Sequence, residues 1–83
     1  MTKDDFFVAI NAVYGVRVWA VVDYWNVQIE STPPREIVFS TEFINANVGV
    51  EGMSPAELKE MLLGIPESKW SKAPNGGLTL YVP

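Results

Sequence analysis

The chain has 83 residues, 48% of them hydrophobic, and its ten acidic residues outweigh six basic ones to give a formal net charge of −4. It contains no histidine and no cysteine, which excludes His-based acid–base catalysis, thiol nucleophiles and the commonest zinc ligands. The negative charge argues against general nucleic-acid binding and against docking on anionic membranes.

The composition predicts one domain over residues 1–83 that is held together by packing, because three Trp, three Tyr and four Phe supply large core side chains. No spaced ligand set indicates a metal site and no glycine-rich loop indicates a nucleotide, so we expect no metal and no cofactor. Acidic residues near Met1 do not suit a secretory signal, and no apolar run approaches the roughly 20 residues of a membrane span. We therefore expect a cytoplasmic protein.

Residues 2–14 are predicted to form the first helix. Thr2 suits the N-cap, with Asp5 three residues later, and acidic residues favour the positive end of the helix dipole. One helical face collects the apolar residues Phe6, Phe7, Ile10, Val13 and Tyr14. Gly15 suits the left-handed position that ends a helix, and we interpret the segment as a core helix.

Residues 16–30 are rich in β-branched and aromatic residues, which favours strand structure. The alternation changes phase inside the segment, because the set Val16, Val18, Ala20, Val22 and Tyr24 shares one parity and the set Trp25, Val27 and Ile29 shares the other. Either a β-bulge near Asp23–Trp25 restores a common face or the chain forms a hairpin. Because no Gly or Pro marks a turn, we favour one long, bent strand.

Ser31-Thr32-Pro33-Pro34 is a predicted loop, since proline cannot donate to a strand ladder. One face of the strand that follows is predicted to hold Ile37, Phe39, Thr41 and Phe43. Residues 44–50 alternate again after a phase change at Phe43–Ile44. A short helix over residues 41–48, capped by Ser40, is the alternative that remains open.

Ser54-Pro55-Ala56-Glu57 predicts the start of a second helix, with an N-cap serine, a first-turn proline and a glutamate that completes a capping box. Gly64 and Pro66 end this helix, and its buried stripe holds Leu58, Met61, Leu62 and Ile65. A turn cluster over residues 73–77 leads to a terminal strand over residues 78–82. Lys69–Lys72 can pair with this strand as a short hairpin.

The predicted order is helix, two or three strands, helix, strand, or α-β-β-(β)-α-β. It indicates a small two-layer α+β domain with an antiparallel sheet of about three to five strands and two helices packed on one face. Such an arrangement leaves the other sheet face open, and an uncovered apolar face is typical of a binding surface.

The candidate partner-binding residues are Asp23, Tyr24, Trp25 and Trp70. Aromatic side chains are the usual anchors of protein interfaces, and Asp23 interrupts an apolar run, where it could accept a hydrogen bond or a salt bridge. A structural role in a bulge or in the core is the alternative for each of them. Without histidine no Ser–His–Asp triad can form, so we expect no enzyme; an acid-only site around Asp23 is the exception left open.

The leading hypothesis is a small acidic binding module that acts by protein–protein contact, through the open sheet face or an edge strand. A phage or mobile-element inhibitor of a host protein would be of this kind, and a homodimer could be built in the same way. The alternatives are a self-assembling subunit, as in a virion, and a weak single-stranded nucleic-acid binder that uses Lys69-Trp70-Ser71-Lys72. The Trp25→Ala variant is predicted to fold but to lose its partner.

Overall fold

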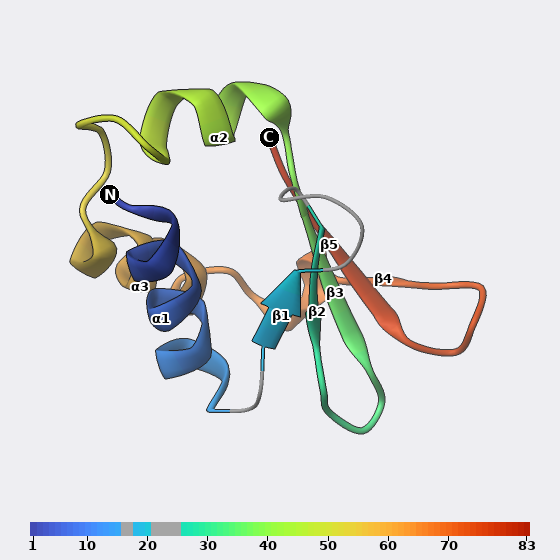
Figure 1. Ribbon diagram of the computed structural model, residues 1–83. Helices are drawn as coiled ribbons and strands as arrows, with labels where there is room; N and C mark the ends of the chain where they lie inside the picture. The colour runs from blue at the N-terminus through green and yellow to red at the C-terminus, as the bar shows by residue number, and fades with distance from the viewer. Residues whose placement is uncertain (16–17, 21–25) are drawn as a thin grey trace.

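The computed structural model describes residues 1–15, 18–20 and 26–83, and of residues 18–20 it describes the backbone alone. Helices α1 and α3 lie together on one face of a five-stranded sheet, and α2 spans one end of the two layers (Figure 1). The predicted two-layer α+β fold is confirmed. In chain order the elements are α1 (Lys3–Tyr14), β1 (Val18–Ala20), β2 (Asn26–Ile29), β3 (Arg35–Phe39), α2 (Thr41–Asn47), α3 (Pro55–Leu63), the 3₁₀ turn η1 (Glu67–Lys69), β4 (Ser71–Lys72) and β5 (Leu78–Val82).

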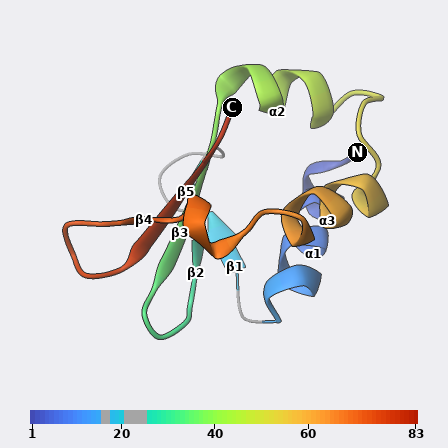
Figure 2. The same ribbon diagram turned by 180° about the vertical axis from the view of Figure 1, so that it is seen from behind.

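The sheet has the strand order β1-β2-β3-β5-β4. Neighbouring strands are antiparallel except for β3 and β5, which run parallel with Arg35 opposite Leu78 and Phe39 opposite Val82. The expected antiparallel sheet is therefore corrected to a mixed sheet. Parallel neighbours need a long crossover between them, and the chain makes it through α2 and α3 before it returns to the sheet (Figure 2).

The segment 16–30 contains two strands and not the single bent strand that the sequence favoured. β1 pairs antiparallel with β2, with Val18 opposite Ile29 and Ala20 opposite Val27. Antiparallel neighbours require a reversal of the chain between them, so the hairpin alternative is correct. The connecting residues 21–25 lie outside the described part of the chain.

β3 ends at Phe39, and the expected continuation of this strand through Phe43 is wrong. The Ser40 hydroxyl accepts a hydrogen bond from the Phe43 N–H at 3.0 Å and caps α2, as the helical alternative proposed. Phe43 and Ile44 are both buried, because consecutive residues can share the inner side of a helix but not one face of a strand. The helix therefore explains the phase change at these two residues.

The ends of α1 and α3 are confirmed in detail. The Thr2 hydroxyl accepts from the Asp5 N–H at 3.0 Å, and Gly15 adopts a left-handed conformation with φ of 63° after α1. Ser54 and Glu57 form a reciprocal capping box, with N–H to side-chain oxygen distances of 3.2 and 3.1 Å. Local hydrogen bonding alone places these boundaries, which is why the sequence located them.

The hydrophobic core lies between the helices and the inner face of the sheet. The inner face contributes Val27, Ile29, Ile37, Phe39, Leu80 and Val82, and the helices contribute Phe6, Ile10, Leu58 and Leu62 among others. The Phe6 ring meets the Phe39 ring nearly edge-on at 4.9 Å between centroids, a favourable aromatic geometry. The predicted hairpin between Lys69–Lys72 and the terminal strand is confirmed for Ser71 and Lys72, which form β4 and pair with β5.

Candidate functional site

Of the predicted partner-binding residues, Asp23, Tyr24 and Trp25 lie outside the described residues, so their assignment stays a prediction. Trp70 is described. It directly follows η1 and is half-buried against the hydrophobic core.

Two neighbours enclose the Trp70 indole ring. The Arg35 guanidinium lies 4.6 Å from the ring centroid, and the Tyr14 ring packs edge-on with its centroid 6.0 Å away. Arg35 also donates to the Glu67 carboxylate at 3.1 Å. These contacts connect the end of α1, the start of β3 and η1, so Trp70 holds the chain in place where it enters β4.

Tyr14 is the residue of this cluster whose acidity changes. Desolvation by burial raises the pKa of Tyr14 above its usual value of 10.0, Arg35 opposes this effect and Glu67 adds to it. A neutral phenol is thereby favoured in the folded protein, in agreement with its place between an indole ring and the hydrophobic core.

The outer face of the sheet, which the helices do not cover, carries polar residues along the described strands. One row of positions across the sheet consists of Trp19 on β1 and then Gln28, Glu36, Thr79 and Ser71, which the strand register places side by side. Val38 and the exposed Tyr81 are the apolar members of the next row. The described side chains of this face are thus mixed, and an apolar binding surface on this face stays a prediction.

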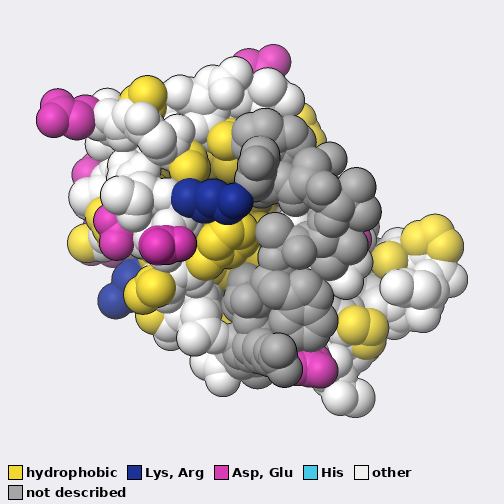
Figure 3. All heavy atoms as spheres, in the orientation of Figure 1, with side chains coloured by type: hydrophobic (Ala, Val, Ile, Leu, Met, Phe, Trp, Pro, Cys, Tyr) yellow, Lys and Arg dark blue, Asp and Glu magenta, His cyan; other side chains and the backbone are white. Residues whose placement is uncertain are grey.

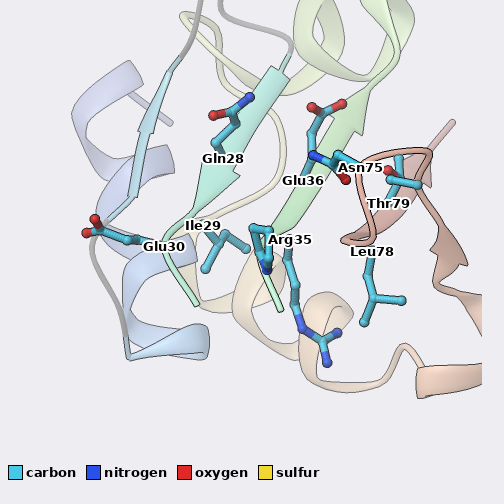
Figure 4. Close-up of a pocket in the computed structure, with 10 residues that line it drawn as sticks. Gln28, Ile29, Glu30, Arg35, Glu36, Asn75, Leu78 and Thr79 are labelled. Atoms are coloured by element: carbon cyan, nitrogen blue, oxygen red, sulfur yellow. The ribbon is translucent and has the colours of Figure 1, made fainter. Parts of the chain in front are cut away.

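A cavity of about 230 Å³ lies at one end of this polar row, lined by Gln28, Glu36, Asn75 and Thr79 among others. Arg35 and Glu36 are neighbours on β3 and point in opposite directions (Figure 4). Within residues 1–15 and 26–83, no three His, Cys, Asp or Glu side chains are grouped as metal ligands. The cavity can offer hydrogen bonds to a ligand, but it contains no nucleophile–base pair among its lining residues.

The edge of β5 that faces β4 has backbone groups available for binding. The Leu78 N–H donates to the Pro34 carbonyl at 2.9 Å, and the Val82 carbonyl accepts from the Ser40 N–H at 2.8 Å. The even-numbered residues of β5 therefore direct their backbone N–H and C=O groups toward β3. Backbone groups alternate along a strand, so Thr79 and Tyr81 direct theirs toward β4. Thr79 is paired with Ser71, the first residue of β4, and Tyr81 lies beyond it.

The chain that precedes β4 does not continue the ladder. The N–H groups of Lys69 and Trp70 donate to the carbonyls of Pro66 and Glu67, each at 3.0 Å, within the turn η1. Among the residues that the structure describes, none pairs with Tyr81 on this side. We call the backbone edge from Tyr81 to Pro83 the open edge.

A groove of about 820 Å³ lies along the open edge, between β5 and the end of α3. Its walls include the apolar residues Met61, Ile65, Leu80 and Val82, and its charged lining residues are Glu60 and Lys69. Neither of these two charges forms an ion pair with a described residue. The open edge and the groove together can accept an extended backbone with apolar side chains.

Sequence reasoning proposed an edge strand but did not locate this one. The available signal was the contrast between the five-residue alternation of residues 78–82 and the short Lys69–Lys72 element beside it. That contrast predicts an incompletely covered strand, but the groove depends on where α3 ends relative to β5. Pairing and packing across the fold decide this, and neither is encoded locally.

In the view of Figure 3, Asp and Glu side chains are scattered and do not gather into one continuous patch. No helix in the described part of the chain is both long enough and apolar enough to cross a membrane.

No protein-family model matches the chain, and comparisons with curated proteins and with solved structures likewise found no match.

Proposed function

We propose that this protein is a binding module whose strand β5 receives an extended segment of another protein along the open edge. The observation that carries the proposal is the backbone of Tyr81, which pairs with no described residue on the β4 side and lies beside an apolar groove. Addition of a strand to a sheet edge combines main-chain hydrogen bonds with pockets for alternate side chains. An inhibitor of a host protein, encoded by a phage or mobile element, is one class that acts in this way and remains part of the proposal.

A second copy of this chain is a poor occupant of the open edge. Antiparallel self-pairing centred on Tyr81 would bring Pro83 of one copy to the end of the available edge, since Ser71 already lies opposite Thr79 for any added strand. Proline also lacks the N–H that a longer ladder would need. We therefore propose a segment of a different protein, and a monomer in solution.

Nucleic-acid binding through Lys69-Trp70-Ser71-Lys72 receives less support. One face of the Trp70 ring is covered by Arg35 at 4.6 Å, so a base could stack there only after that contact breaks. Binding to a phosphate backbone also needs several cations, and the net charge of this protein is −4.

The test is a selection of short random peptides on the immobilised protein, followed by affinity measurements on two variants at one position. Tyr81→Pro removes the N–H at the open edge, whereas Tyr81→Val keeps that N–H and removes the phenol. We expect Tyr81→Pro to weaken the selected peptides by about tenfold or more and Tyr81→Val to weaken them much less. Circular dichroism and thermal unfolding serve as the folding control for both variants.

Failure to select any peptide, or equal binding by both variants, would contradict docking at the open edge. Trp25→Ala is a useful third protein in the same experiment. If it loses the peptides while Tyr81→Pro keeps them, the docking site lies near Asp23, Tyr24 and Trp25, as the sequence hypothesis placed it.

A further inference from the structure

We infer that Asn75, at the tip of the β4–β5 hairpin, is a site of spontaneous covalent modification, and that the closed hairpin slows the reaction. The inference is independent of the proposed function. Among the asparagines of this chain, Asn75 alone is followed by glycine, and its side chain is exposed. Glycine has no Cβ, so its main-chain nitrogen can approach the side chain of the residue before it with little obstruction.

The reaction joins the main-chain nitrogen of Gly76 to the side chain of Asn75. The nitrogen attacks Cγ of Asn75, the new N–Cγ bond forms, and the bond between Cγ and Nδ2 breaks. The proton of the Gly76 N–H leaves with the Nδ2 amino group as ammonia, and a cyclic imide remains. Water then opens the imide. Cleavage between nitrogen and Cγ gives aspartate, and cleavage between nitrogen and the main-chain carbonyl carbon of residue 75 gives isoaspartate.

Both reacting groups are held by hydrogen bonds in the folded hairpin. The Gly76 N–H donates to the Ala73 carbonyl at 3.0 Å, and Oδ1 of Asn75 accepts from the Gly77 N–H at 2.9 Å. Attack breaks the first bond, because the nitrogen has to give up its proton and direct its lone pair toward Cγ. The second bond fixes the orientation of the side-chain amide. The reaction therefore proceeds from states in which the hairpin is open, which local unfolding supplies.

The base of the hairpin offers a way to open it without touching the reacting residues. The Ala73 N–H donates to the Gly77 carbonyl, and the Leu78 N–H donates to the Pro34 carbonyl, each at 2.9 Å. Gly77 is buried, and a Cβ there would lie 2.5 Å from the Pro34 carbonyl oxygen. Gly77→Ala therefore displaces the base of the hairpin and leaves the Asn75–Gly76 sequence intact.

The two products affect the hairpin differently. Aspartate keeps a side-chain oxygen for the Gly77 N–H and adds a negative charge to the cavity that Glu30 and Glu36 also line. Isoaspartate lengthens the main chain by a carbon atom inside the turn, which disturbs the hydrogen bonds between Ala73 and Gly77. Because β4 has two residues, the isoaspartyl product weakens the pairing of β4 with β5.

The experiment follows the replacement of NH2 by OH at Asn75 during incubation at mildly alkaline pH, by mass spectrometry of digests. It compares the parent protein, Gly77→Ala, Ile37→Ala and a synthetic peptide of residues 71–80. Ile37 is fully buried in the core, so its variant lowers global stability and leaves the turn unchanged. We expect the parent protein to react about tenfold or more slowly than the peptide. Gly77→Ala should approach the rate of the peptide, and Ile37→Ala should keep the rate of the parent.

Two internal references and a second hairpin variant complete the design. Asn11 and Asn45 are exposed and are followed by alanine, so both should remain unmodified while Asn75 reacts. Circular dichroism checks that each variant is folded. If Gly77→Ala does not fold, Ser71→Pro takes its place, because it removes the N–H of the exposed β4 residue opposite Thr79.

Three results would overturn the inference. An unmodified Asn75 in a folded hairpin variant, after the peptide has reacted completely, would refute the site. A parent protein that reacts as fast as the peptide would refute protection by the hairpin. Equal acceleration in Gly77→Ala and Ile37→Ala would show that the reaction needs unfolding of the whole domain and not opening of the hairpin alone.

Discussion

The two sides of β5 are paired to very different extents. On the β3 side every residue from Leu78 to Val82 has a partner, and Ser40 adds a further hydrogen bond to Val82. On the β4 side Leu78 and Thr79 alone are paired among the residues that the structure describes. The cause is topological, because β4 is reached from α3 through η1 and the chain joins the sheet only at Ser71. One edge of the strand stabilises the core, and the other edge is the one we propose for binding.

Proline at two neighbouring positions of β5 is the strongest test of this difference. In Leu80→Pro the ring replaces an N–H that faces β3, and a buried side chain is lost, so we expect a loss of more than about 3 kcal/mol in the free energy of unfolding. In Tyr81→Pro the missing N–H faces the open edge, where proline is tolerated, and we expect about 1 kcal/mol or less. Urea unfolding measures both, and equal losses would contradict the asymmetry.

The side of β5 that faces β3 can also be weakened through β3 itself. Ile37 stands opposite Leu80 and is 0% exposed, so Ile37→Ala should cost about 2–5 kcal/mol through lost burial and a residual cavity. Its neighbour Glu36 lies on the outer face, and Glu36→Gln should change stability by less than about 0.5 kcal/mol. Comparable losses of unfolding free energy in the two variants would contradict a buried inner face and an exposed outer face of the sheet.

The β4 side depends on Trp70, which anchors the chain before it joins the sheet. Trp70→Ala removes the contacts with Tyr14 and Arg35, and we expect a loss of about 1–3 kcal/mol. Arg35→Gln keeps the indole ring in the core and should cost less than about 1 kcal/mol, since its partner Glu67 is largely exposed. If Trp70→Ala keeps its unfolding free energy but loses selected peptides, Trp70 is an interface anchor, as the sequence hypothesis proposed.

The smallest expected effect is on stability at high pH. Burial raises the pKa of Tyr14 in the folded protein, so the unfolded chain releases this proton more readily. The stabilisation is fully present below about pH 10 and is lost as the pH rises through the folded-state pKa. The Tyr14→Phe variant should lack this alkaline loss. A pH series of unfolding free energies on both proteins measures it, and identical alkaline slopes would be evidence against a buried phenol.

The candidate site illustrates how far local patterns reach. Sequence reasoning led to an open sheet face or an unlocated edge strand and to Trp70, because aromatic side chains are common interface anchors. It placed Trp70 among the exposed anchors, whereas the structure encloses the ring between Arg35 and Tyr14. These partners are far away in the sequence, so no window around Trp70 could have revealed them.

Features that depend on neighbouring residues could be predicted from the sequence. The caps at Thr2 and Ser54, the end of α1 at Gly15 and the alternation of residues 78–82 follow from hydrogen bonds and periodicity within a few residues. They are enough to indicate two helices, a hairpin at the end of the chain and an α+β domain.

Features that depend on pairing between strands far apart in the sequence could not be predicted. The parallel alignment of β3 with β5 needs the crossover through α2 and α3, and the reversal between β1 and β2 carries no Gly or Pro signal. At Phe43 and Ile44 the same residues suited a strand or a helix, and burial of both against one core selected the helix. The open edge exists for the same reason, because strand partners are chosen by the packing of the whole chain and not by the sequence of the strand alone.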